Sequence, residues 1–445
     1  MFRKSSCNLL LIFVCCFAVG VTDNRQPTYA QSLERIERER AQSMLNAVKD
    51  ELKKNYYDTG FGGMDVEARF KASEEKLKQA TSLGQALGIV AQSLLDLNDS
   101  HTFFIPPSRP VKVEYGWQMQ MIGDKCYVIA VKPESDAAAK GLKPGDLIVS
   151  VEGFKPSRKE MWKMEYYYYT LSPRQGLRLV VQSPGGEPRQ LDVAAKMRQG
   201  KRILDLSGRD ATIDLNELDR ESEDAYRLQR HRFQKVGDIV IWKMPGFDFE
   251  PEQASRLIDE YAMPSAGLIL DLRGNPGGYV LTLERLASHF FDHEVKIADL
   301  KGRKDLKPMV AKKRGDKPFA GRLVVLIDSK SGSAAELFAR LMQIEKRGTI
   351  IGDQSSGSVM RSKVYIRELG VDKIVPFAVS VTDADVIMTD GKSLEHIGVT
   401  PDERLIPTAE DLAAGRDPVL ARAAAILGVK LDPAVAGKFF PIEWK

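Results

Sequence analysis

Residues 239–343 alternate between short apolar runs and longer runs in which apolar residues recur every three or four positions. The short runs cover 239–243, 267–272 and 323–327, and the longer runs cover 252–261, 281–291 and 334–343. Segments that take turns in this way are typical of helices packed on a largely parallel sheet. We therefore expect an α/β domain with a mainly parallel sheet over residues 237–445.

The first half of the chain has a different pattern. Apolar residues at helical spacing predict a helical region over residues 31–105, and a cluster of prolines at 106–110 ends it. Residues 106–200 alternate strand-like runs with glycine turns, which predicts a β-rich module. Residues 201–236 hold too few apolar positions for a core and are expected to be a surface connection. The expected fold is thus multidomain α+β.

The first thirty residues have the layout of a secretory signal peptide. Arg3 and Lys4 precede an apolar run over 9–21, and small residues suited to cleavage follow. About 13 apolar residues fall short of the roughly 20 that a membrane-spanning helix needs. We therefore expect residues 1–30 to be removed on export to the periplasm or the extracellular space, which leaves no membrane span in the mature protein.

The composition argues against other classes of protein. With 43% hydrophobic and 28% charged residues, the chain suits globular domains and not a disordered polymer. Its 65 Lys and Arg are spread along the sequence against 61 Asp and Glu, so no basic stripe indicates nucleic-acid binding.

The cysteines allow no internal disulfide. Cys7, Cys15 and Cys16 fall in the signal segment. Cys126 is left without a disulfide partner and is expected to be a buried core residue in a strand.

One string in the β-rich region resembles the signature of PDZ peptide-binding domains. Residues 141–153, Gly-Leu-Lys-Pro-Gly-Asp-Leu-Ile-Val-Ser-Val-Glu-Gly, combine a tight turn with an apolar strand. A PDZ domain adds a peptide as an extra strand and offers the N–H groups of a hydrophobic-Gly-hydrophobic loop to its terminal carboxylate. Tyr115, Gly116 and Trp117 fit that loop. Alternatively, Gly116 only permits a turn and Trp117 belongs to the core.

Two further motifs stand at the ends of predicted strands. Residues 271–278, Asp-Leu-Arg-Gly-Asn-Pro-Gly-Gly, form a glycine-rich turn that can present N–H groups to a developing negative charge. Ser333 stands where a helix is expected to begin, at capping-box spacing from Glu336. Because a helix N-terminus also favours an alkoxide, the position suits either a cap or a nucleophile.

Together these motifs resemble the carboxy-terminal processing peptidases and the related tricorn core proteases. The likeness covers nearly the whole mature chain and includes residues 56–58 and 398–402. In the processing peptidases a lysine about twenty-five positions after the nucleophile activates it, and the matching position here is Ser358. Lys363 is the nearest substitute, but it lies in an alternating strand pattern and would need a shifted register.

The tricorn branch instead uses an upstream Ser-His pair and a downstream Glu, and this sequence has both. The resemblance implies that His101 takes the proton from Ser333. It also implies that Ser100 links the imidazole to Glu395, which stabilises the imidazolium.

The same resemblance implies an oxyanion hole formed by the N–H of Ala334 and one N–H of Gly277 or Gly278. Four histidines lie outside these motifs and lack metal-ligand spacing: His231, His289, His293 and His396. No zinc or phosphate-loop motif occurs, so neither a metal nor a cofactor is expected.

These observations predict an exported serine endopeptidase that forms an acyl-enzyme on Ser333. Its expected partners are peptide or protein substrates, namely C-terminal tails or unfolded segments with an apolar last residue. Two alternatives stay open. The absent lysine suits a non-catalytic PDZ scaffold that has lost activity, and the same serine chemistry could act on small esters or amides. The sequence does not indicate the oligomeric state.

Overall fold

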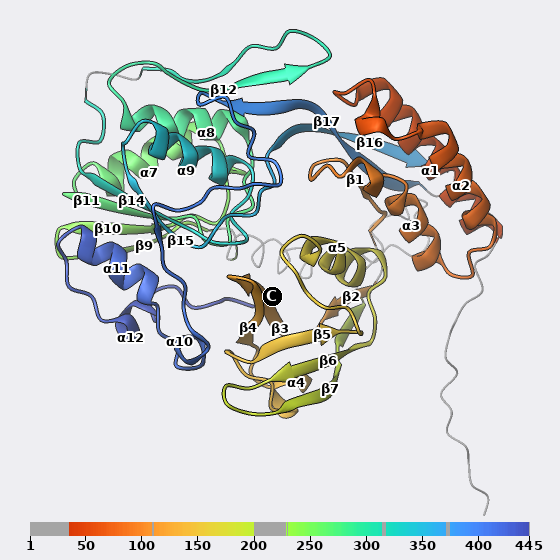
Figure 1. Ribbon diagram of the computed structural model, residues 1–445, viewed down its shortest axis with the longest axis horizontal. Coiled ribbons are helices and arrows are strands. Elements are labelled where there is room, and N and C mark those ends of the chain that lie inside the picture. Colours follow the sequence, from red (N-terminus) through yellow and green to blue (C-terminus); the bar gives the residue numbers. More distant parts are fainter. Residues whose placement is uncertain are drawn as a thin grey trace, which may run out of the picture.

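The computed structural model describes residues 35–108, 111–199, 228, 230–313, 317–370 and 374–444. The expected signal peptide and most of the expected connection lie outside these residues. Within the described ranges, no helix combines the length and the apolar content needed to cross a bilayer. The fold is a mixed α/β multidomain arrangement (Figure 1).

A six-stranded sheet forms the centre of the C-terminal half. Its order is β18-β15-β14-β11-β10-β9, and each neighbouring pair is parallel except β9 and β10. The strands are β9 (Arg232–Val236), β10 (Ile239–Lys243), β11 (Gly267–Asp271), β14 (Arg322–Ile327), β15 (Thr349–Gly352) and β18 (Glu403–Arg404). The helices of this half are α7 (Pro251–Leu257), α8 (Val280–Ala287), α9 (Ala334–Ile344), α10 (Ala409–Ala413), α11 (Pro418–Ile426) and α12 (Pro433–Ala436).

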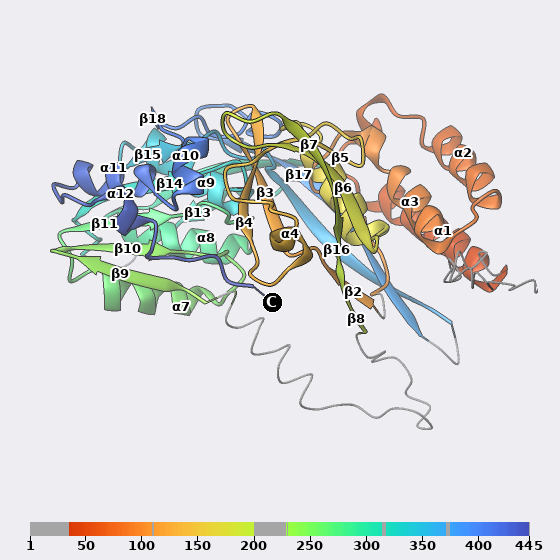
Figure 2. The same ribbon diagram turned by 90° about the horizontal axis from the view of Figure 1, so that it is seen from below.

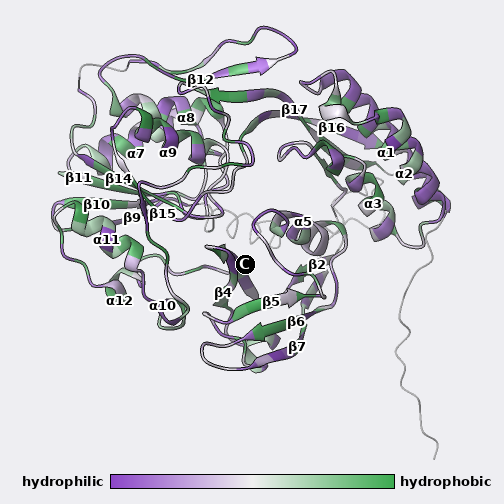
Figure 3. Ribbon diagram, viewed as in Figure 1, coloured by the Kyte–Doolittle hydropathy of each residue, from purple (hydrophilic) through white to green (hydrophobic). Residues whose placement is uncertain are grey.

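Side chains of the central strands alternate between two cores. Trp242 and Leu270 join the cluster that includes α7, α8 and α9, whereas Ile241 and Ile269 pack with α11 and α12 on the other face. All four are fully buried, which explains why the strands are apolar throughout instead of alternating. Figure 3 shows this concentration of hydrophobic residues along the strands. Each such side chain contributes about 1.5–3 kcal/mol, so the sheet is a rigid base for the loops at its edge.

β9 corrects the expected extent of the connection. Residues 232–236 form the edge strand of the sheet and pair antiparallel with β10. Phe233 stacks on Tyr261, with 3.8 Å between ring centroids, and also lies against Trp242. An edge strand has only one partner and one covered face, so its mostly polar composition is compatible with pairing.

A second, antiparallel sheet joins the N-terminal helices to the C-terminal half. Its order is β1-β17-β12-β13. β16 also pairs with β17, and Figure 2 shows these two long strands side by side. The strands are β1 (Phe103–Ile105), β12 (Val295–Gly302), β13 (Met309–Ala311), β16 (Met360–Leu369) and β17 (Val375–Met388). Phe104 pairs with Val379 and is fully buried among α1 (Arg35–Asn55), α2 (Val66–Lys78) and α3 (Leu83–Gln92). The helical region therefore shares its core with β17.

The β-rich region contains a five-stranded antiparallel sheet, ordered β3-β4-β5-β6-β7. Its strands are β3 (Trp117–Ile122), β4 (Lys125–Val131), β5 (Leu147–Val151), β6 (Gly176–Gln182) and β7 (Pro188–Ala194), and β2 (Val111–Glu114) pairs with β8 (Lys196–Gln199). The short helices are α4 (Asp136–Ala139) and α5 (Met161–Glu165). Cys126 is buried and unbonded, and burial raises the pKa of its thiol to about 12. A reactive thiolate is therefore not available there.

Candidate active site

Ser333 stands at a sharp turn between β14 and α9. Its φ of 51° and ψ of −118° lie in a region that residues other than glycine rarely adopt, at a cost of about 1–3 kcal/mol. The N–H of Ser333 donates to the carbonyl of Ser358 at 2.9 Å and to Oε2 of Glu336 at 3.0 Å. Glu336 thus accepts the Ser333 amide hydrogen bond that the capping-box spacing predicts.

The hydroxyl of Ser333 meets the imidazole of His101. His101 Nε2 lies 3.3 Å from Ser333 Oγ, although 232 positions separate the two residues. The backbone N–H of His101 donates to Oδ1 of Asp99 at 2.8 Å, directly before β1 joins the second sheet. Pairing of β1 with β17 therefore carries the histidine from the N-terminal region to the serine.

Ser100 and Glu395 continue the chain of contacts. Ser100 Oγ lies 2.8 Å from His101 Nδ1 and donates to Glu395 Oε2 at 2.8 Å. Oε1 of Glu395 accepts from the N–H of Ser100 at 2.9 Å, and Oε2 accepts from the N–H of Val359 at 2.8 Å. Burial raises the pKa of Glu395, and these hydrogen bonds act in the opposite direction.

This order of contacts assigns the imidazole tautomer. Ionised Glu395 can only accept hydrogen bonds, so it takes the hydroxyl proton of Ser100. Ser100 Oγ must then accept from Nδ1–H of His101, which leaves Nε2 with a lone pair toward Ser333. Burial lowers the pKa of His101, which favours the neutral ring that a general base requires.

The glycine-rich turn lies against Ser333. A Cβ added to Gly277 would come within 2.6 Å of Ser333 Cβ and 2.9 Å of the Ala334 nitrogen. The N–H of Gly277 already donates to Oδ1 of Asn275 at 2.9 Å. Within the described part of the chain, the amides of Gly278 and Ala334 donate to no protein acceptor. Of the two glycines considered, Gly278 therefore fits an oxyanion hole better.

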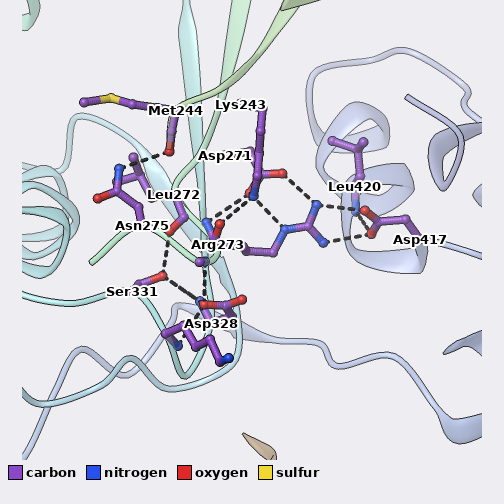
Figure 4. A network of polar contacts seen from close by, with 12 residues as sticks. Lys243, Met244, Asp271, Leu272, Arg273, Asn275, Asp328, Ser331, Asp417 and Leu420 are labelled. Atoms are coloured by element: carbon purple, nitrogen blue, oxygen red, sulfur yellow. Dashed lines mark hydrogen bonds and ion pairs between the residues drawn. The ribbon is translucent and has the colours of Figure 1, made fainter. Parts of the chain in front are cut away.

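A buried ionic network supports this turn (Figure 4). Arg273 donates to both carboxylate oxygens of Asp271 at 2.8–2.9 Å and to both oxygens of Asp417 at 2.7–3.0 Å. Lys243 approaches Asp271 at 3.2 Å. These cations hold the pKa of Asp271 below its usual range despite its burial. The start of the turn is thereby fixed to β10 and to the first turn of α11.

The far end of the turn is fixed to the loop before Ser333. Asn275, which is fully buried, donates from Nδ2 to the carbonyl of Met244 at 3.1 Å and accepts the N–H of Gly332 at its own carbonyl at 2.9 Å. Ser331 Oγ donates to the carbonyl of Leu272 at 2.8 Å. The two motifs predicted from the sequence therefore form one hydrogen-bonded unit.

Neither of the two positions considered for a lysine base supplies one. Ser358 stands at the family lysine position, and its carbonyl binds the Ser333 amide. Lys363 lies on β16, is 63% exposed and forms an ion pair with Asp383 at 3.1 Å.

Two contributors escaped sequence reasoning. His396 lies outside the motifs recognised in the sequence, yet its Nε2 lies 2.6 Å from the carbonyl of Asn98 and 3.6 Å from Oε1 of Glu395. It thus bridges the turn that carries Ser100 and the loop that carries Glu395. The sequence signal for His396 was its position directly after Glu395. The signal for Glu336 was its capping-box spacing from Ser333.

The residues proposed for peptide capture are largely interior. Tyr115 and Trp117 are 3% and 2% exposed and belong to the core of the five-stranded module. Gly116 has a φ of 73°, and a Cβ there would lie 2.5 Å from the Cβ of Ser135. The side chains therefore serve packing, as the alternative interpretation held, and only the backbone of this loop is left for recognition.

A cleft of about 730 Å³ opens beside the site. It is lined on one side by Ser100, Pro276 and Ser358, and on the other by α5 of the five-stranded module, including Trp162 and Lys163. A cavity of this size between two units accommodates a peptide segment.

Comparison with known proteins identifies the chain's relatives. Residues 235–405 match the model of peptidase family S41. The carboxy-terminal-processing protease of Bartonella bacilliformis is 26% identical over 298 residues, which are 64% of this chain but only 60% of that protein. The chloroplastic C-terminal processing peptidase of Tetradesmus obliquus is 25% identical, over 79% of this chain and 74% of that protein.

A solved structure extends the likeness to the fold. Mature CPAF superposes with a TM-score of 0.61 at 15% identity, over 85% of this chain and 94% of that one. At this identity the similarity concerns the fold alone. Together with the family match over residues 235–405 and the sequence relatives, it leads to one conclusion: the chain is similar to the peptidases of family S41.

Proposed function

We propose that the protein is a serine endopeptidase in which Ser333 is the nucleophile and His101 the general base. The observation that carries this proposal is the 3.3 Å contact between His101 Nε2 and Ser333 Oγ. The nitrogen and the hydroxyl oxygen are close enough for proton transfer, since such distances shorten when substrate binds. A non-catalytic scaffold would have no need of a strained serine facing an oriented imidazole.

The reaction follows from the order of contacts. His101 Nε2 accepts the hydroxyl proton as Ser333 Oγ attacks the carbonyl carbon of the peptide bond, and Glu395, through Ser100, stabilises the imidazolium. The N–H groups of Ala334 and Gly278 receive the oxyanion, each worth about 2.7–4 kcal/mol in the transition state.

The imidazolium then gives its proton to the leaving amine, and the C–N bond breaks to leave an acyl-enzyme on Ser333. In the second half, His101 takes a proton from water as the hydroxide attacks the ester. The same proton returns to Ser333 Oγ when the carboxylic acid leaves.

We further propose that residues 106–200 form a PDZ-type module that captures C-terminal tails or unfolded segments. β3 lies at an edge of its sheet in the described residues, where an added strand can pair. Gln120 of β3 donates to Oδ2 of Asp328 at 2.7 Å, five residues before Ser333. A peptide bound along β3 would therefore be delivered near the nucleophile. Export from the cytoplasm is proposed on the signal layout of residues 1–30.

Labelling with a fluorophosphonate tests the proposal. The wild type is expected to be labelled and to cleave a fluorescently labelled unfolded protein, whereas Ser333→Ala and His101→Ala lose both activities. His293→Ala is the matched control, because His293 is exposed and contacts Asp292. Absence of labelling in the folded wild type would favour a scaffold. Turnover of p-nitrophenyl esters without any cleavage of the protein substrate would favour a small-molecule hydrolase.

A further inference from the structure

Glu336 is fully enclosed beside the nucleophile. None of its surface is exposed, and its carboxylate accepts four hydrogen bonds. Oε2 accepts the N–H groups of Ser333 and Ser358, both at 3.0 Å. Oε1 accepts the N–H of Gly357 at 2.7 Å and the hydroxyl of Ser355 at 2.6 Å. Four donors from two segments therefore converge on one side chain.

The contacts of Oε2 do not depend on the ionisation of this group. Burial raises the pKa of Glu336 to about 7, so the acid and the carboxylate coexist near neutral pH. A proton on Oε1 can be donated to Ser355 Oγ, because that oxygen accepts the N–H of Val399 at 2.6 Å and has a second lone pair. Oε2 keeps accepting from Ser333 and Ser358 in both forms.

Residues 357–359 connect this carboxylate to the other one in the site. The amides of Gly357 and Ser358 bind Glu336, and the next amide, that of Val359, binds Oε2 of Glu395 at 2.8 Å. The carbonyl of Ser358 accepts the N–H of Ser333 at 2.9 Å. Three successive amides are thus held by two carboxylates, and the segment links the nucleophile to the acid.

We propose that Glu336 is a positioning residue that holds the backbone of Ser333 in its strained conformation and sets, through residues 357–359, the separation between Ser333 and Glu395. The inference rests on the proposed peptidase function. The segment that carries a catalytic lysine in related peptidases acts here through its main chain, and Glu336 is the residue that fixes it.

A graded pair of substitutions tests this role. In Glu336→Gln, the amide oxygen can face Ser333 and Ser358 while the NH₂ group donates to Ser355 Oγ, so the Gly357 amide and the Ser355 hydroxyl lose their acceptor. In Glu336→Met, a side chain of similar length removes every acceptor. Glu345 lies at the exposed C-terminal end of the same helix, so Glu345→Gln and Glu345→Met are matched controls.

The expected result is a loss of kcat with little change in KM. Glu336→Gln should lower kcat about tenfold and Glu336→Met about 100-fold or more, because small displacements of reacting groups have effects of this size. Fluorophosphonate labelling should slow in the same order, while both Glu345 variants match the wild type. Thermal unfolding is followed for each protein, and rates are measured well below each transition and divided by the folded fraction.

The proposal would be overturned if Glu336→Gln and Glu336→Met had the same kcat as the wild type. It would also be overturned if their losses of kcat vanished after correction for the folded fraction. If both Glu336 variants fail to fold, Ser355→Ala decides, since it removes one contact of Oε1 and should lower kcat severalfold without altering KM. An unchanged kcat in that variant would count against the role. An inactive wild type would refute the proposed function instead, so the two failures are distinguishable.

Discussion

Ser100 Oγ lies 2.8 Å from Oε2 of Glu395, although 295 positions separate these residues in the chain. This contact joins the turn after the N-terminal helices to a loop near the C-terminal end of the fold. Because a carboxylate only accepts hydrogen bonds, the contact also determines where the protons of Ser100 and His101 lie.

Glu395→Gln is expected to reverse that proton order. The glutamine NH₂ group can donate to Ser100 Oγ, which then donates to Nδ1 of His101 and leaves Nε2 protonated and unable to act as a base. We expect kcat to fall about 10³- to 10⁴-fold, as for a wrong tautomer in a serine-histidine-acid site. Ser100→Ala, which removes the link without enforcing the wrong tautomer, should lose less. Steady-state kinetics measure these losses of kcat, and Glu410→Gln, at an exposed position, is the control. A near-wild-type kcat in Glu395→Gln would contradict the prediction.

Gly277→Ala is expected to disable the oxyanion turn. The new methyl group would lie 2.6 Å from Ser333 Cβ at a backbone φ of 103°, so the turn and the nucleophile must separate. We expect kcat to drop about 100-fold or more with a smaller change in KM. Gly274→Ala in the same turn has a similar positive φ but no atom within 4 Å of the added carbon. It should therefore lose only stability, and a comparable kcat loss in both variants would argue against the assignment.

The acid limb of kcat/KM should have its midpoint below pH 6.5. Burial lowers the pKa of His101 from its ordinary 6.5, and only the neutral ring can accept the proton of Ser333. Activity is therefore present above the lowered pKa and lost as pH falls through it.

The free energy of unfolding should fall in the same window, because the unfolded chain binds this proton at a higher pH than the folded one. A pH–rate profile measures the acid limb of kcat/KM, and His293→Ala serves for comparison. A midpoint above 6.5 would contradict it.

His396→Ala should weaken catalysis without removing a reacting group. Loss of its 2.6 Å contact with the carbonyl of Asn98 frees the turn that carries Ser100 and His101. We expect kcat to fall roughly tenfold, in line with the loss of one positioning hydrogen bond. A loss of stability that fully accounts for the activity change would show that the contact matters only for folding.

Asp417→Asn should destabilise the protein. It removes one of the two carboxylates around Arg273, whose side chain is 20% exposed, and leaves the guanidinium with Asp271 alone. Breaking a buried pair costs about 3–5 kcal/mol, and partial exposure reduces this to roughly 2–4 kcal/mol. Denaturant unfolding measures the change. The exposed pair of Arg422 and Glu403 is the control, since Glu403→Gln should cost under about 1 kcal/mol.

Local patterns were sufficient to predict the elements that carry Ser333 and the glycine-rich turn. Apolar runs over 239–271 and 322–344 form β10, β11, β14 and α9 at the expected positions. These segments bury both faces of each strand or one face of a helix, so hydrophobic periodicity reports them directly. The strand β9 was missed because an edge strand needs few apolar residues.

Motif order in the sequence was sufficient to nominate Ser333, His101, Ser100 and Glu395, but not to show that they meet. Only the tertiary structure brings them together, because β1 pairs with a strand about 275 positions later and loop closure over such distances leaves no local trace. The fold likewise decided that Glu336 and His396 belong to the site. Their roles depend on which backbone amides and carbonyls surround them, and nearly every residue carries these groups, so the sequence does not single them out.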